Sequence, residues 1–358
     1  MVNWHLTITL LVVITSSCGG GSPVPDPDPV IENTNPVFTP VFADPTVLDN
    51  RSRDGYFYAY ATQDKWERVA TSIHIVPIIR STDLVNWEFV GDVFSEQPTW
   101  NIDENQVWAP DIEYRNGQYF LYYSLSKWGA SNSAIGVTVS DSPVGPFTDL
   151  GKVLDSNGSG VANSIDPYYF KDSDGKEYLF WGSFHGIYGV PLEADGKTVR
   201  LEEKFQIAGT AFEAAYIFSK DGYYYLMASV GSCCDGDYSY HVTIARSQTL
   251  SGPYLDVNGK DVNEVYSWQY GEDDKSVNVL YRSRDVVAPG HNSEIITDDE
   301  GTEWILYHAI EVPDYTLPGG GPKRPLFIDK VTWNEDGWPK IGNGGTPTTG
   351  EIELPSIN

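Results

Sequence analysis

A pattern of tight turns and aromatic strands recurs five times along this chain. In each copy a short segment with a polar or charged residue precedes a Gly-bearing turn, and a strand of alternating aromatic residues follows. The five turns are Asp54-Gly55, Asn116-Gly117, Asp174-Gly175, Asp221-Gly222 and Glu300-Gly301. Asp-Gly and Asn-Gly between alternating apolar runs predict a β-hairpin, because both central residues of the favoured turn need positive φ.

A second alternating stretch follows each hairpin, as at residues 78–81, 135–139 and 242–246, and often a closing strand follows that. About four strands per unit is the number in a propeller blade. The turn glycines are unevenly spaced, so the connecting loops must differ in length. We therefore expect an all-β chain folded as a five-bladed β-propeller, with a long-looped β-sandwich as the alternative.

Composition agrees with one large all-β domain. The 358 residues include 11 Trp and 23 Tyr but only 2 Met, and 34 Gly and 23 Pro punctuate the chain. The net charge of −27 repels phosphate backbones and anionic lipid headgroups, so we expect no nucleic-acid partner and no membrane binding by the folded domain. A neutral substrate or a cation is compatible with this charge, which also helps to keep an exported protein soluble. We expect a monomer.

The amino-terminal region indicates export. The apolar run Leu6–Ile14 is too short to span a bilayer and has the length of a signal-peptide core. The junction before Cys18 resembles a bacterial lipoprotein cleavage site, so residues 1–17 are predicted to be the signal peptide and Cys18 the acylated residue. Residues 18–36 are rich in Gly, Pro and Asp and predict a flexible tether, which leaves 37–358 for the propeller. The expected location is an outer-membrane lipoprotein, at the surface or in the periplasm of a Gram-negative bacterium.

Two further cysteines, Cys233 and Cys234, are adjacent in sequence. Neighbouring cysteines cannot form an ordinary long-loop disulfide framework. They are either a vicinal disulfide or two free thiols, and free thiols are the more frequent case.

The phase of the repeat predicts a functional pocket. If each segment before a hairpin is the innermost strand of its blade, five ionisable residues point to the same end of the axis. These are Asp44, Asp111, Asp166, Glu213 and His291. Each of them alone could simply cap a strand or bond to a turn, but a matching set of costly buried charges indicates a site. Clustered carboxyl groups push their pKa values apart, which suits hydrolysis of a glycosidic bond.

The segments that carry these residues resemble glycoside hydrolase family 43 over residues 37–345. They are FADPTV at 42–47, WAPDI at 108–112, SIDP at 164–167, FEAAYI at 212–217 and GHNS at 290–293. The resemblance implies that Asp44 is the general base, that Asp166 raises the pKa of the acid and orients it, and that Glu213 is the general acid. It also implies a single displacement with inversion of configuration.

Residues 212–216, 232–236 and 245–247 are most similar to the arabinan-cleaving branch, so the implied substrate is arabinan, cleaved at its α-1,5-L-arabinofuranosyl linkages. That branch carries a calcium ion on the propeller axis, and His291 is the matching ligand. A single nitrogen is a poor match to the oxygen preference of calcium, so a neutral, hydrogen-bonded His291 is the alternative.

Four other residues are candidates for substrate binding. Trp108 and Phe42 could stack on sugar rings, and Asp111 could bond to hydroxyl groups. Arg324 could reach the substrate or the carboxylate of Asp166. Trp108 could equally pack between blades, and Arg324 could be structural.

Rival functions remain open at this stage. Within the family the chain could be an exo-acting α-L-arabinofuranosidase or a β-xylosidase. A retaining, fructan-cleaving propeller would use the first Asp as a nucleophile. A surface lipoprotein that binds glycans without cleaving them is the alternative outside enzymology.

Overall fold

The computed structural model describes residues 33–66, 73–101, 105–234, 236–313, 316 and 321–357. Residues 33–358 form one compact unit, distinct from residues 1–32. The expected signal peptide, the acylated Cys18 and the tether up to residue 32 lie outside the described residues. Within the described part of the chain, no helix is both long and apolar enough to cross a membrane.

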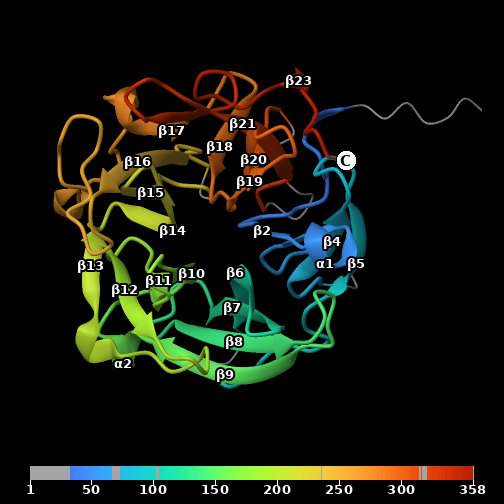
Figure 1. Cartoon of the computed structure of the whole chain (residues 1–358), viewed down its shortest axis with the longest axis vertical. Coiled ribbons are helices and arrows are strands. Elements are labelled where there is room, and N and C mark those ends of the chain that lie inside the picture. Colours follow the sequence, from blue (N-terminus) through green and yellow to red (C-terminus); the bar gives the residue numbers. More distant parts are fainter. Residues whose placement is uncertain are drawn as a thin grey trace, which may run out of the picture. The chain divides into compact units, whose positions relative to one another are not determined.

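The larger unit consists of five antiparallel sheets arranged around a central axis, and the first strand of each lies nearest the centre (Figure 1). The first sheet contains β2 (Thr46–Asp49), β3 (Phe57–Tyr60), β4 (Pro77–Ser81) and β5 (Glu88–Asp92). The second contains β6 (Gln106–Arg115), β7 (Gln118–Ser126), β8 (Ala134–Ser140) and β9 (Thr148–Asp155). The third contains β10 (Tyr168–Lys171), β11 (Glu177–Trp181), β12 (Ile187–Leu192) and β13 (Phe205–Ala208).

The fourth sheet contains β14 (Phe212–Lys220), β15 (Tyr223–Val230), β16 (His241–Ser247) and β17 (Asn278–Leu280). In the fifth, β18 (Val286–Gly290) and β19 (Ile295–Thr297) both pair with β20 (Glu303–Glu311), which is followed by β21 (Leu326–Trp333) and β22 (Pro339–Ile341). The helices are short: α1 (Arg51–Asp54), α2 (Ser156–Ser159) and the 3₁₀ turns η1 (Leu201–Glu203), η2 (Val262–Glu264) and η3 (Lys275–Val277). The predicted five-bladed β-propeller is therefore confirmed.

The five predicted turns all join the first two strands that they were expected to join. Two of them are tight two-residue turns in which both residues have positive φ, Asn116-Gly117 with 53° and 88° and Asp221-Gly222 with 51° and 80°. The other three connections are longer, and the turn glycine supplies the positive φ.

The core lies between blades rather than within one. Five buried apolar clusters each combine residues from two neighbouring sheets, one cluster for each of the five contacts around the ring. Phe57 of β3 packs with Leu306 of β20, for example, and Leu179 of β11 packs with Tyr122 of β7. Burial of these side chains holds every blade to both neighbours, so the ring is closed by the same forces that hold its other joints.

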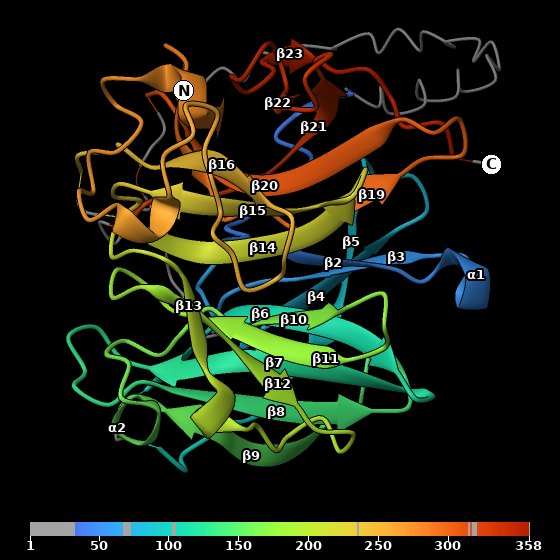
Figure 2. The ribbon, with the colours of Figure 1, turned by 60° about the vertical axis from the view of Figure 1, so that its left-hand side comes forward.

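The two ends of the propeller unit meet beside the fifth blade. Strand β1 (Thr34–Asn35) pairs with β23 (Gly350–Glu351), and the backbone N–H of Val37 donates to the carbonyl of Leu326 at 2.8 Å. Figure 2 shows this closure from another side, above the stacked strands of the sheets. Residues 33–36 were expected to belong to the tether, but the structure places Thr34 and Asn35 in the propeller unit.

Candidate active site

A cleft of about 1100 Å³ lies at the end of the axis where the innermost strands begin. Four of the five ionisable residues expected there line it: Asp44, Asp166, Glu213 and His291. Trp108 and Arg324 also line it. The repeat therefore brings together most of the residues that its phase predicted.

A backbone feature common to the five blades explains how these side chains are presented. An equivalent residue in each blade, just before or within the innermost strand, has positive φ: Asp44 (55°), Ala109 (41°), Asp166 (57°), Ala214 (55°) and His291 (48°). Positive φ is uncommon outside glycine and is concentrated at functional sites, where surrounding structure must enforce it.

A side chain from the preceding blade accepts the backbone N–H of each of these residues. The acceptors, in blade order, are His308 Nδ1 (3.1 Å), Thr62 Oγ1 (2.8 Å), Ser124 Oγ (2.9 Å), Asp166 Oδ2 (3.2 Å) and Ser229 Oγ (2.9 Å). Because a buried N–H must find a partner, each blade depends on its neighbour to hold this strained position.

A comparison of equivalent positions in the second and fourth blades shows that Asp111 does not lie where the repeat predicted. In the second blade, Trp108 pairs with Ser124 as Glu213 pairs with Ser229 in the fourth, and a β-bulge follows each of them. Trp108 is thus the counterpart of Glu213, and Asp111 lies three residues further along its strand. It does not line the cleft but lies in a separate cavity of about 30 Å³ on the axis, where it is 4% exposed.

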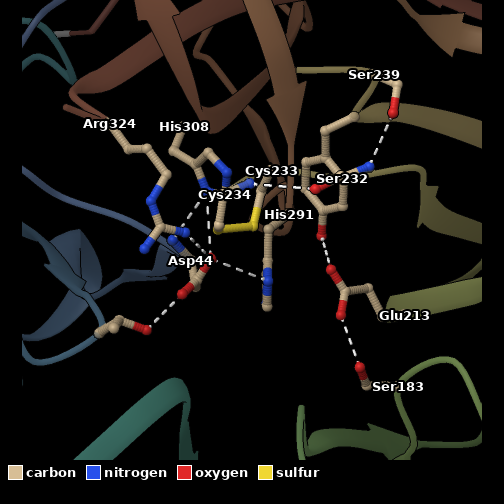
Figure 3. Close-up of a disulfide and its surroundings, with 12 residues drawn as sticks. Asp44, Ser183, Glu213, Ser232, Cys233, Cys234, Ser239, His291, His308 and Arg324 are labelled. Atoms are coloured by element: carbon tan, nitrogen blue, oxygen red, sulfur yellow. Dashed lines mark hydrogen bonds and ion pairs between the residues drawn. A yellow bond between two sulfur atoms is a disulfide. The ribbon is translucent and has the colours of Figure 1, made fainter. Parts of the chain in front are cut away.

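Asp44 is surrounded by cationic and hydroxyl donors from other elements (Figure 3). Its Oδ1 lies 3.3 Å from Nη1 of Arg324 and 3.2 Å from Nδ1 of His291, and Thr62 donates to its Oδ2 at 2.5 Å. Burial alone would raise the pKa of Asp44, but the charges of Arg324 and His291 outweigh it and hold this pKa well below its usual range. Asp44 is therefore ionised. Arg324 thus contacts the carboxylate of Asp44, whereas the expectation from the sequence was that it could reach the carboxylate of Asp166.

Glu213 has neutral partners instead. The hydroxyl of Tyr240 donates to its Oε1 at 2.6 Å, and that of Ser183 donates to its Oε2 at 2.7 Å (Figure 3). Burial raises the pKa of Glu213, and the two hydrogen bonds offset this only in part. The pKa values of Asp44 and Glu213, which line one cleft, are thus shifted in opposite directions from their ordinary values.

Asp166 lies between Asp44 and Glu213 in the sequence, and it is buried in the lining of the same cleft. Burial raises its pKa to about 8, and the nearby Glu213 adds to this effect while His291 opposes it. Its Oδ2 accepts the backbone N–H of Ala214, the residue next to Glu213. Asp166 therefore fixes the backbone that carries Glu213, and the two carboxyl groups titrate as a pair.

Two residues of the site carry no signal in the sequence. His308 lies in the middle of β20, and burial lowers its pKa to about 4, so its neutral ring accepts the N–H of Asp44. Tyr240 precedes β16, and its ring stacks on His308 with 5.7 Å between centroids. Neither belongs to a repeated motif, so only the folded ring reveals them.

The wall of the cleft contains a pair of cysteines and an exposed aromatic ring, and neither agrees with what the sequence led us to expect. Cys233 and Cys234 form a vicinal disulfide that lines the cleft (Figure 3), so the expectation that free thiols are more frequent does not hold here. Phe42 was a candidate stacking platform, but it is fully buried and packs edge-on against Phe38 at 5.5 Å. It cannot contact a sugar. Trp128, which is 84% exposed, lines the cleft instead.

His291 borders both the cleft and the axial cavity. Burial opposes its protonation, but Asp44, Asp166 and Glu213 raise its pKa to about 9. Among the described residues, no three side chains of His, Cys, Asp or Glu converge as a metal-binding group. The axial cavity is nevertheless rich in oxygen: Asp111 and Glu294 line it, and so does Asn292, whose buried Oδ1 accepts no hydrogen bond.

A closed propeller whose axial cleft holds an ionised carboxylate and a carboxyl group of raised pKa has the groups that general acid–base hydrolysis requires. The sequence matches Glycosyl hydrolases family 43 over residues 33–339. The chain belongs to this family and is a glycoside hydrolase. Its resemblance to the arabinan-cleaving branch is confirmed by its relatives.

One relative is the extracellular exo-α-(1→5)-L-arabinofuranosidase ArbA of Cellvibrio japonicus, which is 33% identical over 78% of this chain and 83% of its own length. Another is the extracellular endo-α-(1→5)-L-arabinanase 1 of Bacillus subtilis, 32% identical over 83% of this chain and 86% of its own. Among solved structures, the α-L-arabinanase of Cellvibrio cellulosa complexed with arabinohexaose superimposes with a TM-score of 0.70 and 30% identity, covering 84% of this chain and 95% of that one.

Proposed function

We propose that this protein hydrolyses α-1,5-L-arabinofuranosyl linkages in arabinan with inversion of configuration. The observation that carries the proposal is the pair of opposite pKa shifts in one cleft, low for Asp44 and raised for Glu213. The names of the relatives support the substrate, since they act on arabinan from chain ends or internally. A neutral polysaccharide also suits a chain with a net charge of −27.

In the proposed mechanism Glu213 protonates the oxygen of the leaving sugar while Asp44 takes a proton from the attacking water. Arg324 and Thr62 keep Asp44 ionised and oriented. Tyr240 and Ser183 orient Glu213, and burial raises its pKa, which favours retention of its proton until the bond breaks. Asp166 positions the backbone beside Glu213. The bond to the leaving oxygen breaks as the bond from water to the anomeric carbon forms, so the configuration inverts.

A product time course on debranched arabinan, followed by proton NMR, tests this function. We expect β-arabinofuranose ends as the first product, because inversion of an α-linkage gives the β-anomer. Arabinoxylan, aryl arabinofuranosides and aryl xylosides serve as controls. Early α-anomers would indicate a retaining enzyme, faster xyloside cleavage a β-xylosidase, and binding without turnover a glycan-binding lipoprotein. Arabinose alone as the early product would identify exo action, and mixed oligosaccharides endo action.

We also propose a calcium ion in the axial cavity, held by Nε2 of His291, which must lose its proton when the ion binds while Nδ1 still donates to Asp44, with water completing the shell of the ion. The oxygens of Asp111, Asn292 and Glu294 line this cavity and fit a hydrated cation, although only one nitrogen would bind directly. When bound, the cation would supply positive charge that favours the ionised forms of nearby carboxyl groups. Mass spectrometry of metal content should give one calcium per chain in the wild type and none in His291→Ala. Equal metal content in both proteins would contradict the site.

Export as a lipoprotein anchored through Cys18 is a further proposal, supported by the extracellular location in the names of the relatives. Cys18→Ser should move the enzyme from the membrane fraction to the soluble fraction of fractionated cells. A soluble wild type whose amino terminus lies beyond Cys18 would contradict the anchor.

A further inference from the structure

The fourth blade has an unusually long connection between its last two strands. Residues 248–277 join β16 to β17, thirty residues in all (Figure 1). The corresponding connections in the other four blades contain between five and twelve residues, at 82–87, 141–147, 193–204 and 334–338. A connection of this length within a compact domain is uncommon and is usually functional.

This connection is fixed to the propeller at both ends of its central part. Val262 and Val265 are buried in the core between the third and fourth sheets. Further along, the ring of Tyr270 packs on Phe212 with 5.6 Å between centroids, and its carbonyl oxygen lies 2.8 Å from Nε2 of His241. Asn278 donates to the carbonyl of Gly271 at 2.8 Å. Residues 262–271 are therefore held in place by packing and by hydrogen bonds.

Two large aromatic side chains project between these anchors. Tyr266 is 66% exposed and Trp268 is 52% exposed, and both line the cleft that holds Asp44 and Glu213. Burial of an aromatic ring against a partner is favourable, so fixed backbone that leaves two such rings in solvent is typical of a binding surface.

A second hollow, of about 590 Å³, adjoins the cleft at Tyr266, which lines both. Its other polar lining includes Asp256, Asn258, Lys260 and Asp274. Flat aromatic rings beside carboxylate, amide and ammonium groups provide what a sugar needs, since its apolar face stacks while its hydroxyls form hydrogen bonds.

We propose that Tyr266 and Trp268 form a glycan-binding subsite for an arabinan chain, which continues from them into the hollow. This rests on the proposed function. The two rings line the same cleft as Asp44 and Glu213, so an arabinan chain that extends along this wall from the proposed cleavage point reaches them. The subsite therefore discriminates by chain length, since a short substrate ends before it reaches the two rings.

The test compares kcat/KM on debranched arabinan with kcat/KM on arabinotriose for wild type, Tyr266→Ala and Trp268→Ala. The ratio of kcat/KM on arabinan to kcat/KM on arabinotriose should fall about tenfold in each alanine variant. The fall should come mainly from a higher KM on arabinan, as expected for loss of one stacking contact. Tyr266→Phe and Trp268→Phe, which keep a ring, should restore most of the ratio. Leu255→Ala is the matched control, because Leu255 is 40% exposed on the same connection but lines neither hollow.

The outcomes separate the two proposals. If the wild type cleaves arabinan and the alanine variants keep the wild-type ratio, the subsite is wrong and the proposed function stands. If the wild type leaves arabinan intact, the proposed function is wrong and the subsite falls with it. Equal losses on both substrates would show that the rings support the catalytic groups rather than a distant part of the chain.

Discussion

The pKa values of Asp44 and Glu213 are shifted in opposite directions because the partners of these two carboxyl groups differ in charge. Asp44 has a guanidinium and a protonated imidazole within 3.3 Å, whereas Glu213 has two hydroxyl groups. Both side chains are withdrawn from water, which raises a carboxyl pKa; the charged partners of Asp44 reverse that effect, whereas the hydroxyl partners of Glu213 offset it only in part. A difference of this kind lets one cleft hold a base and an acid at the same pH.

The acid role proposed for Glu213 predicts a selective loss of activity. Glu213→Gln keeps the size of the side chain but cannot supply a proton, so kcat/KM on arabinan should fall by about 10²–10⁴. On 2,4-dinitrophenyl α-L-arabinofuranoside, whose leaving group departs without protonation, the loss should stay below about tenfold. Glu202→Gln, the same change at an exposed position, is the control. Comparable losses on both substrates would contradict the assignment.

At the scale of elements, two carboxyl groups hold blades together: Asp111 on strand β6 and Glu294 just before β19. Asp111 accepts the backbone N–H of Tyr169 in the next blade at 2.6 Å and shares a hydrogen bond with Glu294. Glu294 in turn accepts the N–H of Val47 at 2.9 Å. Burial raises the pKa values of Asp111 and Glu294, and it raises that of Glu113 to about 7, with Glu294 adding to the last effect.

These raised pKa values predict that the fold loses stability as pH rises. A carboxyl group whose pKa is higher in the folded state stabilises the fold below its unfolded pKa, and this contribution disappears as pH passes the folded value. For Glu113 the window is from about 4.5 to about 7. Glu113→Gln should therefore gain on the order of 2 kcal/mol of unfolding free energy over wild type between pH 5 and pH 8. Urea unfolding of wild type and Glu113→Gln at both pH values measures this difference in free energy.

Glu202→Gln again serves as the control, because its exposed side chain should give the same difference from wild type at both pH values. A Glu113→Gln protein whose difference from wild type does not change with pH would show that Glu113 is not held protonated by the fold.

What the sequence predicts at this scale depends on whether a feature repeats. The turns at Asn116-Gly117 and Asp221-Gly222 are local and chemically specific, so the hairpins and the blade count were predicted correctly. A β-bulge has no comparable signal, and the one after Trp108 moved Asp111 out of the cleft. His308 was missed because its role exists only when the fifth blade meets the first.

At the scale of the whole molecule, few residues fasten the amino-terminal strand β1 to the fifth blade. The buried side chain of Asn35 donates to the carbonyls of Ile328 (2.8 Å) and Thr348 (3.2 Å) and accepts the N–H of Ile328 (2.9 Å). These contacts fasten β1 to the fifth blade near the β1–β23 pair.

Asn35→Ala should lower the unfolding free energy by about 2–3 kcal/mol, because it leaves a buried N–H and two carbonyls without partners. Enzyme activity well below the melting temperature should remain. Thr34→Ala is the matched control, since the pairing of Thr34 with Glu351 is through the backbone. Denaturant unfolding measures both, and equal stability of the two variants would show that Asn35 does not fasten the ring.

The closure seam also passes through the site. Asp44 precedes β2 of the first blade, whereas His291, His308 and Arg324 all belong to the fifth. Glu213 meets Ser183 and Tyr240 within the third and fourth blades alone. The proposed acid therefore needs only these two blades to dock, whereas the proposed base gains its counter-charges only when the fifth blade packs against the first. Hydrolysis by the proposed mechanism consequently requires a closed ring, so a chain that lacks the fifth blade would keep the surroundings of Glu213 but lose those of Asp44.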